Sequence, residues 1–382
     1  MDEKELEMTS QEFVPEVELQ ESPVETPPEN KPAGKKQTKK RKRWVRILLI
    51  TLCVILGLAL LLLIIGAVFV FRWLNMIDRT DGHLDPMSSS EMAEFLENNT
   101  DPWDPNSTVE EVDPNDVTWE TVPKIEDKKH IVNILLIGSD TRDPGERARS
   151  DSMILCTLNK KTKTVTMTSF LRDMYVQIPG YLDNRINASY AFGGMKLLNK
   201  TLEVNFGVHV DGNVVIEFEN FEDVIDMVGG VNITLTQAEA DYMNKYGERD
   251  SKRKGTFVAG PTRLDGIDAL TYSRCRKVDS DFGRANRQRI VLNAVFEQCK
   301  NLSPTQLYKL LDKVLPLVTT DMSNGEILDY ASDVIPMMSG LTIKTQHIPA
   351  SGTYRDAWVR KMLVLLPNLP ANRQLLEDTI GG

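Results

Sequence analysis

The chain has 382 residues, of which 41% are hydrophobic and 26% are charged, and its formal net charge is −10 at pH 7. This length accommodates one large domain or two small ones with appendages. We find no internal period of about 20 to 50 residues, which argues against a repeat protein. The chain has no basic stripe with interleaved aromatic residues and no G-x-x-x-x-G-K-[ST] loop. We therefore expect no nucleic-acid partner and no ATP site of that type.

The N-terminal segment is polar and strongly charged. Residues 1–34 carry ten acidic side chains and several prolines but almost no aromatic residues. Eight basic residues follow between Lys35 and Arg46. Such a composition cannot bury enough apolar surface to fold. We interpret residues 1–46 as a disordered acidic and basic tail.

Residues 47–71 form an uncharged, apolar run of 25 positions. As a helix, this run is roughly 37 Å long, more than the ~30 Å hydrocarbon core of a bilayer. It is too long for a cleavable signal, and no A-x-A-like site follows before Arg72. Because the basic cluster lies directly before the span, we predict a single-pass cell-membrane protein with a cytoplasmic N-terminus and an extracellular remainder.

Residues 72–129 are rich in Asp, Pro, Asn and Ser. This composition predicts an extracellular stalk or linker, with one short helix around residues 88–98. Outside the span the chain has three cysteines, an odd number without metal-like spacing: Cys156, Cys275 and Cys299. We interpret them as buried core residues and leave a disulfide among them open.

The folded domain is expected over residues 130–382. A continuous apolar run predicts a buried strand at 131–137, and two further strands joined by a hairpin are expected at 152–158 and 164–170. Helical patterns at 193–207, 218–230 and 285–302 alternate with expected strands at 231–236 and 270–276. This order predicts the α/β class, an α/β/α sandwich with a central mixed sheet, preceded by one transmembrane helix.

Charged residues gather at the ends of these expected strands, where α/β sheets bind ligands. Period-2 alternation in the strand expected at 270–276 would place Arg274 and Arg276 on one face and Cys275 on the other. The remaining charged residues follow the first strand (Asp140), precede the second (Arg147, Arg149, Asp151), follow the third (Arg172, Asp173) or enter the last helix (Asp281, Arg284, Arg287).

This combination of residue types indicates a phosphate-rich ligand. One guanidinium group binds two phosphate oxygens at once, and Mg²⁺ prefers one or two carboxylates together with phosphate. Burying two arginines without a counter-anion is costly. The residues alone therefore point to a diphosphate, whereas Arg147, Asp173 and Arg289 are interpreted as solvated or salt-bridged surface residues.

Seven segments resemble the LytR-CpsA-Psr family of bacterial cell-wall proteins in order and spacing. The resemblance covers about residues 130 to 300, and residues 352–382 are similar to the family's C-terminal portion. The segments are NILLIGSDTR, RSDSM, SFLRD, RINASYAFGG, TLEVNFGVHVDGNVVIEFENFEDVIDMVGGV, LDGIDALTYSRCR and DFGRANRQR.

The resemblance implies a polyprenyl-phosphate glycan phosphotransferase. Such an enzyme takes a glycopolymer, for example teichoic acid or capsule, from undecaprenyl pyrophosphate and attaches it through a phosphodiester to the 6-hydroxyl of N-acetylmuramic acid in peptidoglycan. The implied partners are thus an undecaprenyl-pyrophosphate-linked glycan, peptidoglycan and the lipid bilayer.

The resemblance also implies roles for individual residues. Asp140 and Asp151 correspond to carboxylates associated with Mg²⁺ (or Mn²⁺), and Asp281 or Asp151 could accept the proton of the attacking hydroxyl. Arg185 stands where a lysine is usual, and SFLRD stands where SIPRD is common. The corresponding pyrophosphate-binding arginines are Arg172, Arg274, Arg276, Arg284 and, less directly, Arg287; with the three aspartates, the first four make up the expected catalytic set.

Two other functions are kept as alternatives. The domain could bind a lipid pyrophosphate without transferring it, as a sensor or scaffold, or it could hydrolyse it as a membrane-anchored pyrophosphatase. Residues 192–202 and 218–228 could line an apolar groove for the lipid, although helical stripes of this kind are more often plain core.

Overall fold

The fold is that of a computed structural model, which describes residues 36–102, 107–140, 147–247, 255–275, 278–300 and 302–381. Most of the expected tail, residues 1–35, lies outside these ranges. The chain divides into two units, Met1–Gly66 and Ala67–Gly382. Helix α1 (Lys36–Leu74) contains the apolar run, and its segment Val54–Leu74 is long and apolar enough to cross a membrane. This helix indicates a single-pass membrane protein.

A mixed seven-stranded sheet forms the centre of the second unit, in the order β1-β10-β7-β2-β3-β4-β11. The β2/β3/β4 meander is antiparallel, whereas β7 and β11 pair in parallel with β2 and β4. The strands are β1 (Asp78–Arg79), β2 (Ile131–Asp140), β3 (Arg149–Asn159), β4 (Thr164–Phe170), β7 (Gly212–Glu217), β10 (Val318–Thr320) and β11 (Thr342–Ile348).

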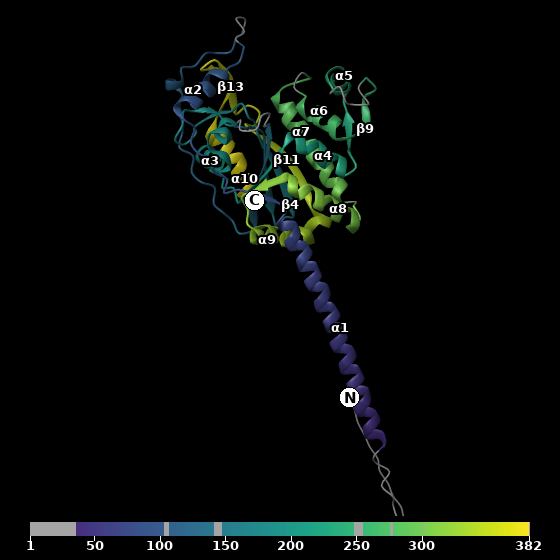
Figure 1. Cartoon of the computed structure of the whole chain (residues 1–382). Helices are drawn as coiled ribbons and strands as arrows, with labels where there is room; N and C mark the ends of the chain where they lie inside the picture. The colour runs from purple at the N-terminus through teal and green to yellow at the C-terminus, as the bar shows by residue number, and fades with distance from the viewer. Residues whose placement is uncertain are drawn as a thin grey trace, which may run out of the picture. The chain divides into compact units, whose positions relative to one another are not determined.

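Helices cover both faces of this sheet (Figure 1), so the predicted α/β/α sandwich is confirmed. On one face, α3 and α10 pack on β3 around a core that contains Leu135, Leu155 and Phe206. On the other face, α4 contacts β2 and β7, and α7 contacts β4 and β11. The helices are α2 (Ser89–Asn98), α3 (Ala188–Phe206), α4 (Phe218–Met227), α5 (Gln237–Tyr246), α6 (Gly266–Arg274), α7 (Asp281–Lys300), α8 (Pro304–Val314), α9 (Asn324–Val334) and α10 (Leu369–Gly381).

Three two-stranded sheets lie outside the central one. The strand predicted at 231–236 belongs to such a hairpin, in which β8 pairs with β9, and α5, α6 and α7 pack around it. The other pairs are β5 with β6 and β12 with β13. Their bounds are β5 (Tyr175–Val176), β6 (Asn184–Arg185), β8 (Val231–Leu235), β9 (Gly260–Leu264), β12 (Tyr354–Val359) and β13 (Met362–Pro367).

The strand predicted at 270–276 is wrong, because residues 266–274 form helix α6. The Asp265 side chain caps this helix by accepting a hydrogen bond from the Asp268 N–H at 3.0 Å. Residues 268–273 are all buried, so the run shows no amphipathic period, and a short buried helix and a buried strand look alike in sequence. Arg274 is the last residue of this helix, and Arg276 lies outside the described residues. The argument that paired Arg274 and Arg276 on one strand face therefore fails.

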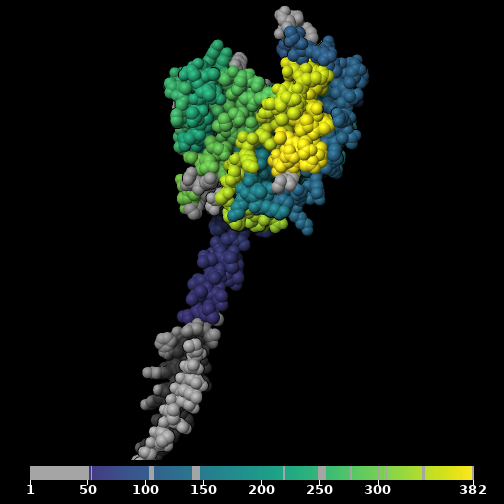
Figure 2. Space-filling model, turned by 180° about the vertical axis from the view of Figure 1, so that it is seen from behind, coloured from purple at the N-terminus to yellow at the C-terminus, as the bar shows by residue number. Residues whose placement is uncertain are grey.

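The segment expected to be a stalk packs on the folded domain instead. β1 is an edge strand of the central sheet, and Glu111 forms a β-bridge with Trp358. Met92 and Phe95 of α2, the short helix that was predicted, pack against the main core. In Figure 2 this blue segment runs beside the yellow C-terminal elements. The segment is polar overall, so the sequence did not show that its few apolar residues would pack on the folded domain.

Candidate active site

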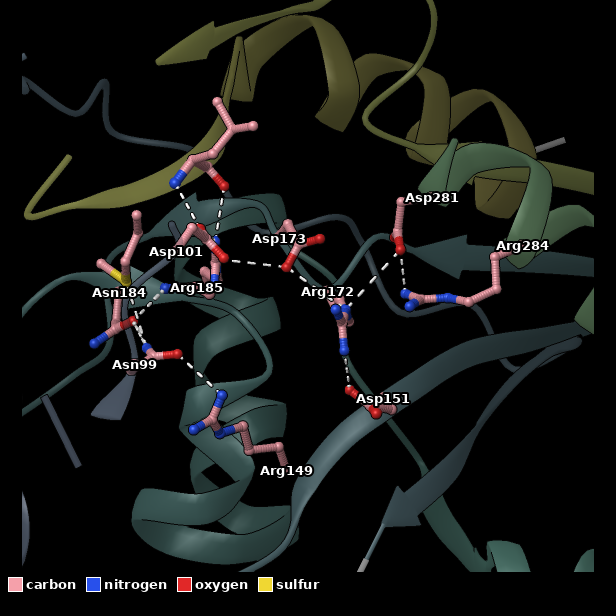
Figure 3. Close-up of polar contacts among 12 residues, drawn as sticks. Asn99, Asp101, Arg149, Asp151, Arg172, Asp173, Asn184, Arg185, Asp281 and Arg284 are labelled. Carbon is pink, nitrogen blue, oxygen red and sulfur yellow. Dashed lines mark hydrogen bonds and ion pairs between the residues drawn. The ribbon is translucent and has the colours of Figure 1, made fainter. Parts of the chain in front are cut away.

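Four of the predicted site residues lie together, with Asp151, Asp281 and Arg284 around Arg172, which lies just after β4. Its Nη1 donates a 2.6 Å hydrogen bond to Asp151 Oδ1. Its Nε lies 3.6 Å from Asp173 Oδ1 and 3.9 Å from Asp281 Oδ1. Asp281 in turn forms an ion pair with Arg284. Figure 3 shows Arg172 at the centre of this group, with carboxylates on three sides.

Strand register explains how Asp151 and Arg172 meet. In the antiparallel β3/β4 ladder, Ile154 pairs with Ser169. Asp151 lies three positions before Ile154, and Arg172 lies three positions after Ser169, so continuing the ladder sets them opposite each other. A hydrogen bond between residues that are 21 positions apart in sequence is thus a direct consequence of the hairpin.

The α7 N-terminus brings Arg284 and Asp281 to the same place. Asp281 is in the first turn of α7, where the helix dipole favours a negative charge. Arg284 lies one turn further along and is 4% exposed. The N–H groups of a helix start also attract phosphate. The site therefore combines two arginines with a helix terminus, each able to bind an anion.

Electrostatics keep Arg172 charged although it is largely buried. Burial acts to lower the pKa of Arg172, but the nearby carboxylates of Asp173, Asp151 and Asp281 outweigh this and raise its pKa above the ordinary value. Without ligand, carboxylates thus compensate the guanidinium charge. A pyrophosphate entering the site would provide alternative, bidentate partners for the same guanidinium groups.

A second branch of the network extends from Arg172 through Asp173. Asp173 Oδ1 lies 3.4 Å from Arg185 Nε, and Arg185 forms an ion pair with Asp101 and donates a 2.9 Å hydrogen bond to the Leu363 carbonyl. Asp173 is therefore salt-bridged, as its interpretation as a solvated or salt-bridged residue allowed, and its partners are Arg172 and Arg185. Asp101 belongs to the expected linker, and its Asp-Pro surroundings contain no signal that could have identified it.

Next to this branch, the end of α2 contacts the strands. Asn99 donates a 3.0 Å hydrogen bond to Asn184 Oδ1 and accepts one from Arg149 Nη1, also at 3.0 Å. The segment before β2 therefore supports the strands that position Arg172 and Arg185.

The other predicted arginines are placed differently. Arg287 is 2% exposed and binds Asp279, Glu239 and the Cys275 carbonyl, which ties the start of α7 to α5 and the end of α6. Arg289 is also buried, so its interpretation as a surface residue is wrong.

The remaining predicted positions are Arg274, Asp140 and Arg276. Arg274 ends α6 and its side chain is exposed. Asp140 ends β2 opposite Arg149 of β3, but its side chain lies outside the described part of the structure, as does Arg276. The predicted cysteines Cys156, Cys275 and Cys299 are free thiols.

An apolar cavity of about 170 Å³ lies next to the arginines, between the sheet and α4, α6 and α7. Ser152, directly after Asp151, and Gln288, one turn beyond Arg284, are part of its lining. Phe221, Val224 and Ile225 of α4 line it too, which is the groove-lining alternative raised for residues 218–228, whereas residues 192–202 are not among its lining. The remaining lining residues are Leu136, Ile137, Gly138, Ile154, Ile216, Leu270, Ser273, Leu292 and Val295.

Comparisons with known proteins identify the family of this chain. The sequence pattern of the LytR_cpsA_psr family matches residues 90–373. The chain belongs to this family. Family membership thus extends to residue 90, into the segment that the sequence suggested was a linker.

Several relatives of this LytR_cpsA_psr protein have descriptive names. The polyisoprenyl-teichoic acid–peptidoglycan teichoic acid transferase TagT of Bacillus subtilis is 32% identical over 258 residues, which are 66% of this chain and 78% of TagT. The transferase TagU of Bacillus licheniformis is 38% identical over 205 residues, 52% of this chain and 63% of TagU.

Solved structures of this family have the same fold. A structure of TagT bound to LIIa-WTA is 30% identical, covers 68% of this chain and 94% of its own, and has a TM-score of 0.55. A structure of YwtF (TagT) with bound octaprenyl pyrophosphate lipid is 27% identical, covers 69% of this chain and 98% of its own, and has a TM-score of 0.52.

Proposed function

We propose that this protein transfers a glycopolymer from an undecaprenyl-pyrophosphate carrier to peptidoglycan, forming a phosphodiester at the 6-hydroxyl of N-acetylmuramic acid. The observation that carries this proposal is the position of α7. Its first turns supply Asp281 and Arg284 to the polar cluster, and Leu292 and Val295 line the apolar cavity further along the same helix. A lipid pyrophosphate has the same two parts, a charged head and an apolar tail.

Two kinds of relatives support the proposal. TagT and TagU are named as transferases that act between a polyisoprenyl-linked teichoic acid and peptidoglycan, and one neighbouring structure holds an octaprenyl pyrophosphate lipid. The polar cluster and apolar cavity provide a physical reason why this chain would bind a similar donor.

The proposed reaction is a displacement at phosphorus. The acceptor hydroxyl oxygen forms a bond to the glycan-side phosphorus, the bond from that phosphorus to the bridging oxygen breaks, and undecaprenyl phosphate leaves with the electron pair. The hydroxyl proton passes to a carboxylate, for which Asp281 and Asp151 are the two candidates. Arg172 and Arg284 stabilise the charge that moves onto the equatorial and leaving oxygens.

Magnesium or manganese is the metal proposed for this site. The described residues contain no group of three or more His, Cys, Asp or Glu side chains arranged to hold a metal ion. Mg²⁺, however, needs only one or two protein carboxylates when phosphate oxygens complete its shell. Asp151, which faces Arg172, fits this role, and Asp140 at the end of β2 would be the second ligand. The metal would neutralise part of the pyrophosphate charge.

The location follows from the same chemistry. The basic residues before the apolar run favour a cytoplasmic N-terminus, so we propose that the domain lies outside the cell. There it would meet both a donor held in the membrane and the peptidoglycan acceptor.

The test uses the full chain in lipid nanodiscs with Mg²⁺, a short lipid-pyrophosphate glycan and peptidoglycan oligomers, with products identified by mass spectrometry. We expect a phosphodiester-linked glycan from the wild type. In Arg172→Gln its rate should fall by about 10²–10³-fold, because one preorganised charge at the reacting phosphate is lost. Arg355→Gln is the matched control, since Arg355 is exposed and its ion-pair partner among the described residues is Glu110.

Omitting peptidoglycan separates this function from the alternatives. A transferase makes no product without the acceptor. Glycan phosphate released equally well without peptidoglycan would instead indicate a hydrolase. Donor binding without any turnover would indicate a sensor or scaffold.

A further inference from the structure

Arg289 of α7 is a buried arginine that has no counter-charge among the residues that the structure describes. It is 4% exposed, and its Nη1 donates a 2.6 Å hydrogen bond to Ser169 Oγ while its Nη2 donates a 3.3 Å bond to Asn286 Oδ1. Its Nε has no hydrogen-bond partner. No carboxylate in the described ranges forms an ion pair with it. Arg287 and Arg172, by contrast, each pair with acidic side chains.

Burial of the Arg289 guanidinium without a counter-charge costs free energy. Burial lowers the pKa of Arg289 to about 10, and no neighbouring charge offsets the effect. Burying a guanidinium group with only neutral partners costs free energy unless an anion binds to it. Neither the arginine cluster nor the apolar cavity of the proposed reaction uses this residue.

Arg289 lines a groove of about 590 Å³ between β8, α7 and β11. Figure 2 shows this side of the molecule, where the green atoms of α7 lie beside the yellow-green C-terminal strands. Six of its twelve lining residues carry amide or hydroxyl groups and four are apolar, and the charged ones are Arg289 and, two turns along α7, Glu297. Its residues are Asn232, Ile233, Thr234, Asn286, Arg289, Ile290, Asn293, Ala294, Glu297, Gln298, Ile343 and Thr345.

This lining differs from that of the apolar cavity on the opposite side of α7. Asn, Gln and Thr side chains donate and accept hydrogen bonds without charge, as sugar hydroxyls require. One buried arginine among them adds a partner for a carboxylate or a phosphate. Arg289 follows Arg284 by five positions, about 7.5 Å along the helix axis and about 140° around it, so the groove lies on a different face of α7 from Arg284.

We propose that this groove binds a segment of an anionic glycan, with Arg289 on its carboxylate or phosphate group. The choice of a glycan rests on the proposed function. The anionic group has two sources, the peptide carboxylates of the peptidoglycan acceptor or the phosphates of the donor polymer. Helix α7 thus separates a lipid side from a sugar side.

The first experiment measures binding to the full chain in nanodiscs by calorimetry. The probes are a soluble muropeptide, the same muropeptide with its carboxylates amidated, and a lipid-free polyol-phosphate oligomer. We expect one anionic probe to bind, and which one identifies the source. Arg289→Gln should weaken this binding by about tenfold or more, since a charge-assisted hydrogen bond is lost. Failure of both anionic probes to bind, or equal affinity in Arg289→Gln, overturns the proposal.

A second variant tests the groove without removing the buried arginine. Asn293 lies one turn after Arg289 on the groove side, so Asn293→Asp places a carboxylate at i+4 where it can pair with the guanidinium. We expect this variant to raise the thermal midpoint of unfolding and to abolish binding of the anionic probe, because its own carboxylate occupies the place of the ligand. Asn98→Asp, exposed on α2, adds the same charge elsewhere and should do neither. Unchanged probe binding in Asn293→Asp contradicts the proposal.

The last probe is a lipid-pyrophosphate donor whose short glycan carries no further phosphate or carboxylate, so that it has no anionic group for Arg289. Its binding should be lost in Arg172→Gln and kept in Asn293→Asp. If donor binding behaves in this way while no anionic glycan binds the groove, the groove proposal fails and the transferase proposal stands. If the wild type does not bind the donor, the result instead counts against the transferase proposal.

Discussion

At the scale of single residues, the buried arginines of this domain differ in what neutralises them. Arg172 shares three carboxylates near the surface of the site, where a ligand could replace them. Arg287 is enclosed by Asp279, Glu239 and a backbone carbonyl, and these bonds outweigh burial and raise its pKa. The first arrangement is suited to binding a ligand, whereas the second stabilises the fold.

Arg287→Met tests this distinction. The change leaves Glu239, with a side chain 10% exposed, without its cationic partner. We expect the free energy of unfolding to fall by about 3–5 kcal/mol, as for other broken buried ion pairs. Denaturant unfolding followed by tryptophan fluorescence measures this loss. Arg172→Gln should change stability much less while removing transfer, and comparable stability losses in the two variants would contradict the assignment.

At the scale of elements, the segment that follows the membrane helix packs against a kink in α3. Gly193 and Gly194 have non-helical dihedral angles, and Gly194 has φ +66°. A Cβ at position 194 would lie 2.8 Å from the Gly82 carbonyl oxygen, which accepts a 2.9 Å hydrogen bond from the Lys196 N–H. The glycine therefore permits both the turn in the helix and the close approach of the backbone.

Gly194→Ala should therefore destabilise the domain in two ways. The positive φ costs about 1–2 kcal/mol for any residue with a Cβ, and overlap with the Gly82 carbonyl adds about 1–3 kcal/mol. Gly180→Ala is the matched control, since Gly180 has φ +83° but no atom within 4 Å of the added Cβ. Thermal unfolding should show a larger loss for position 194, and equal losses at both positions would refute the proposed contact.

At the scale of the whole molecule, the function depends on which side of the membrane holds the domain. The reaction needs a lipid-linked donor and a cell-wall acceptor on one side. The free cysteines of the domain give little background for a labelling test, because burial raises the pKa of Cys156 to about 12 and also raises that of Cys275 and Cys299. Few reactive thiolates are then present at neutral pH.

A membrane-impermeant maleimide reports the topology directly. Glu94→Cys places an exposed thiol on α2, and we expect it to be labelled in intact cells. Thr9→Cys, in the tail, should be labelled only after permeabilisation, because the basic flank stays in the cytoplasm. The wild type controls for native cysteines. The reverse labelling pattern would show that the domain is cytoplasmic and would exclude a peptidoglycan acceptor.

The sequence by itself determined the membrane helix, the strands β2, β3 and β4 with the β3/β4 hairpin, and the helices α2, α3, α4 and α7, because their signals are local. A long apolar run, a hairpin and an amphipathic period are each readable from neighbouring residues. The meeting of Asp151 and Arg172 belongs to the same group, because one hairpin sets the register between them. The family motifs placed Asp281 and Arg284 in the same site.

The tertiary structure alone decided the rest, because it depends on partners far apart in the chain. Residues 266–274 are buried all around and so lacked a period that would identify a helix. Arg172, Arg287 and Arg289 look alike in sequence, and only their surroundings distinguish a site residue, a structural ion pair and a guanidinium without a counter-charge. Asp101 and Arg185 are 84 positions apart, and folding brings them together beside the site. Long-range packing thus determines which charges are compensated within the protein and which are available to a ligand.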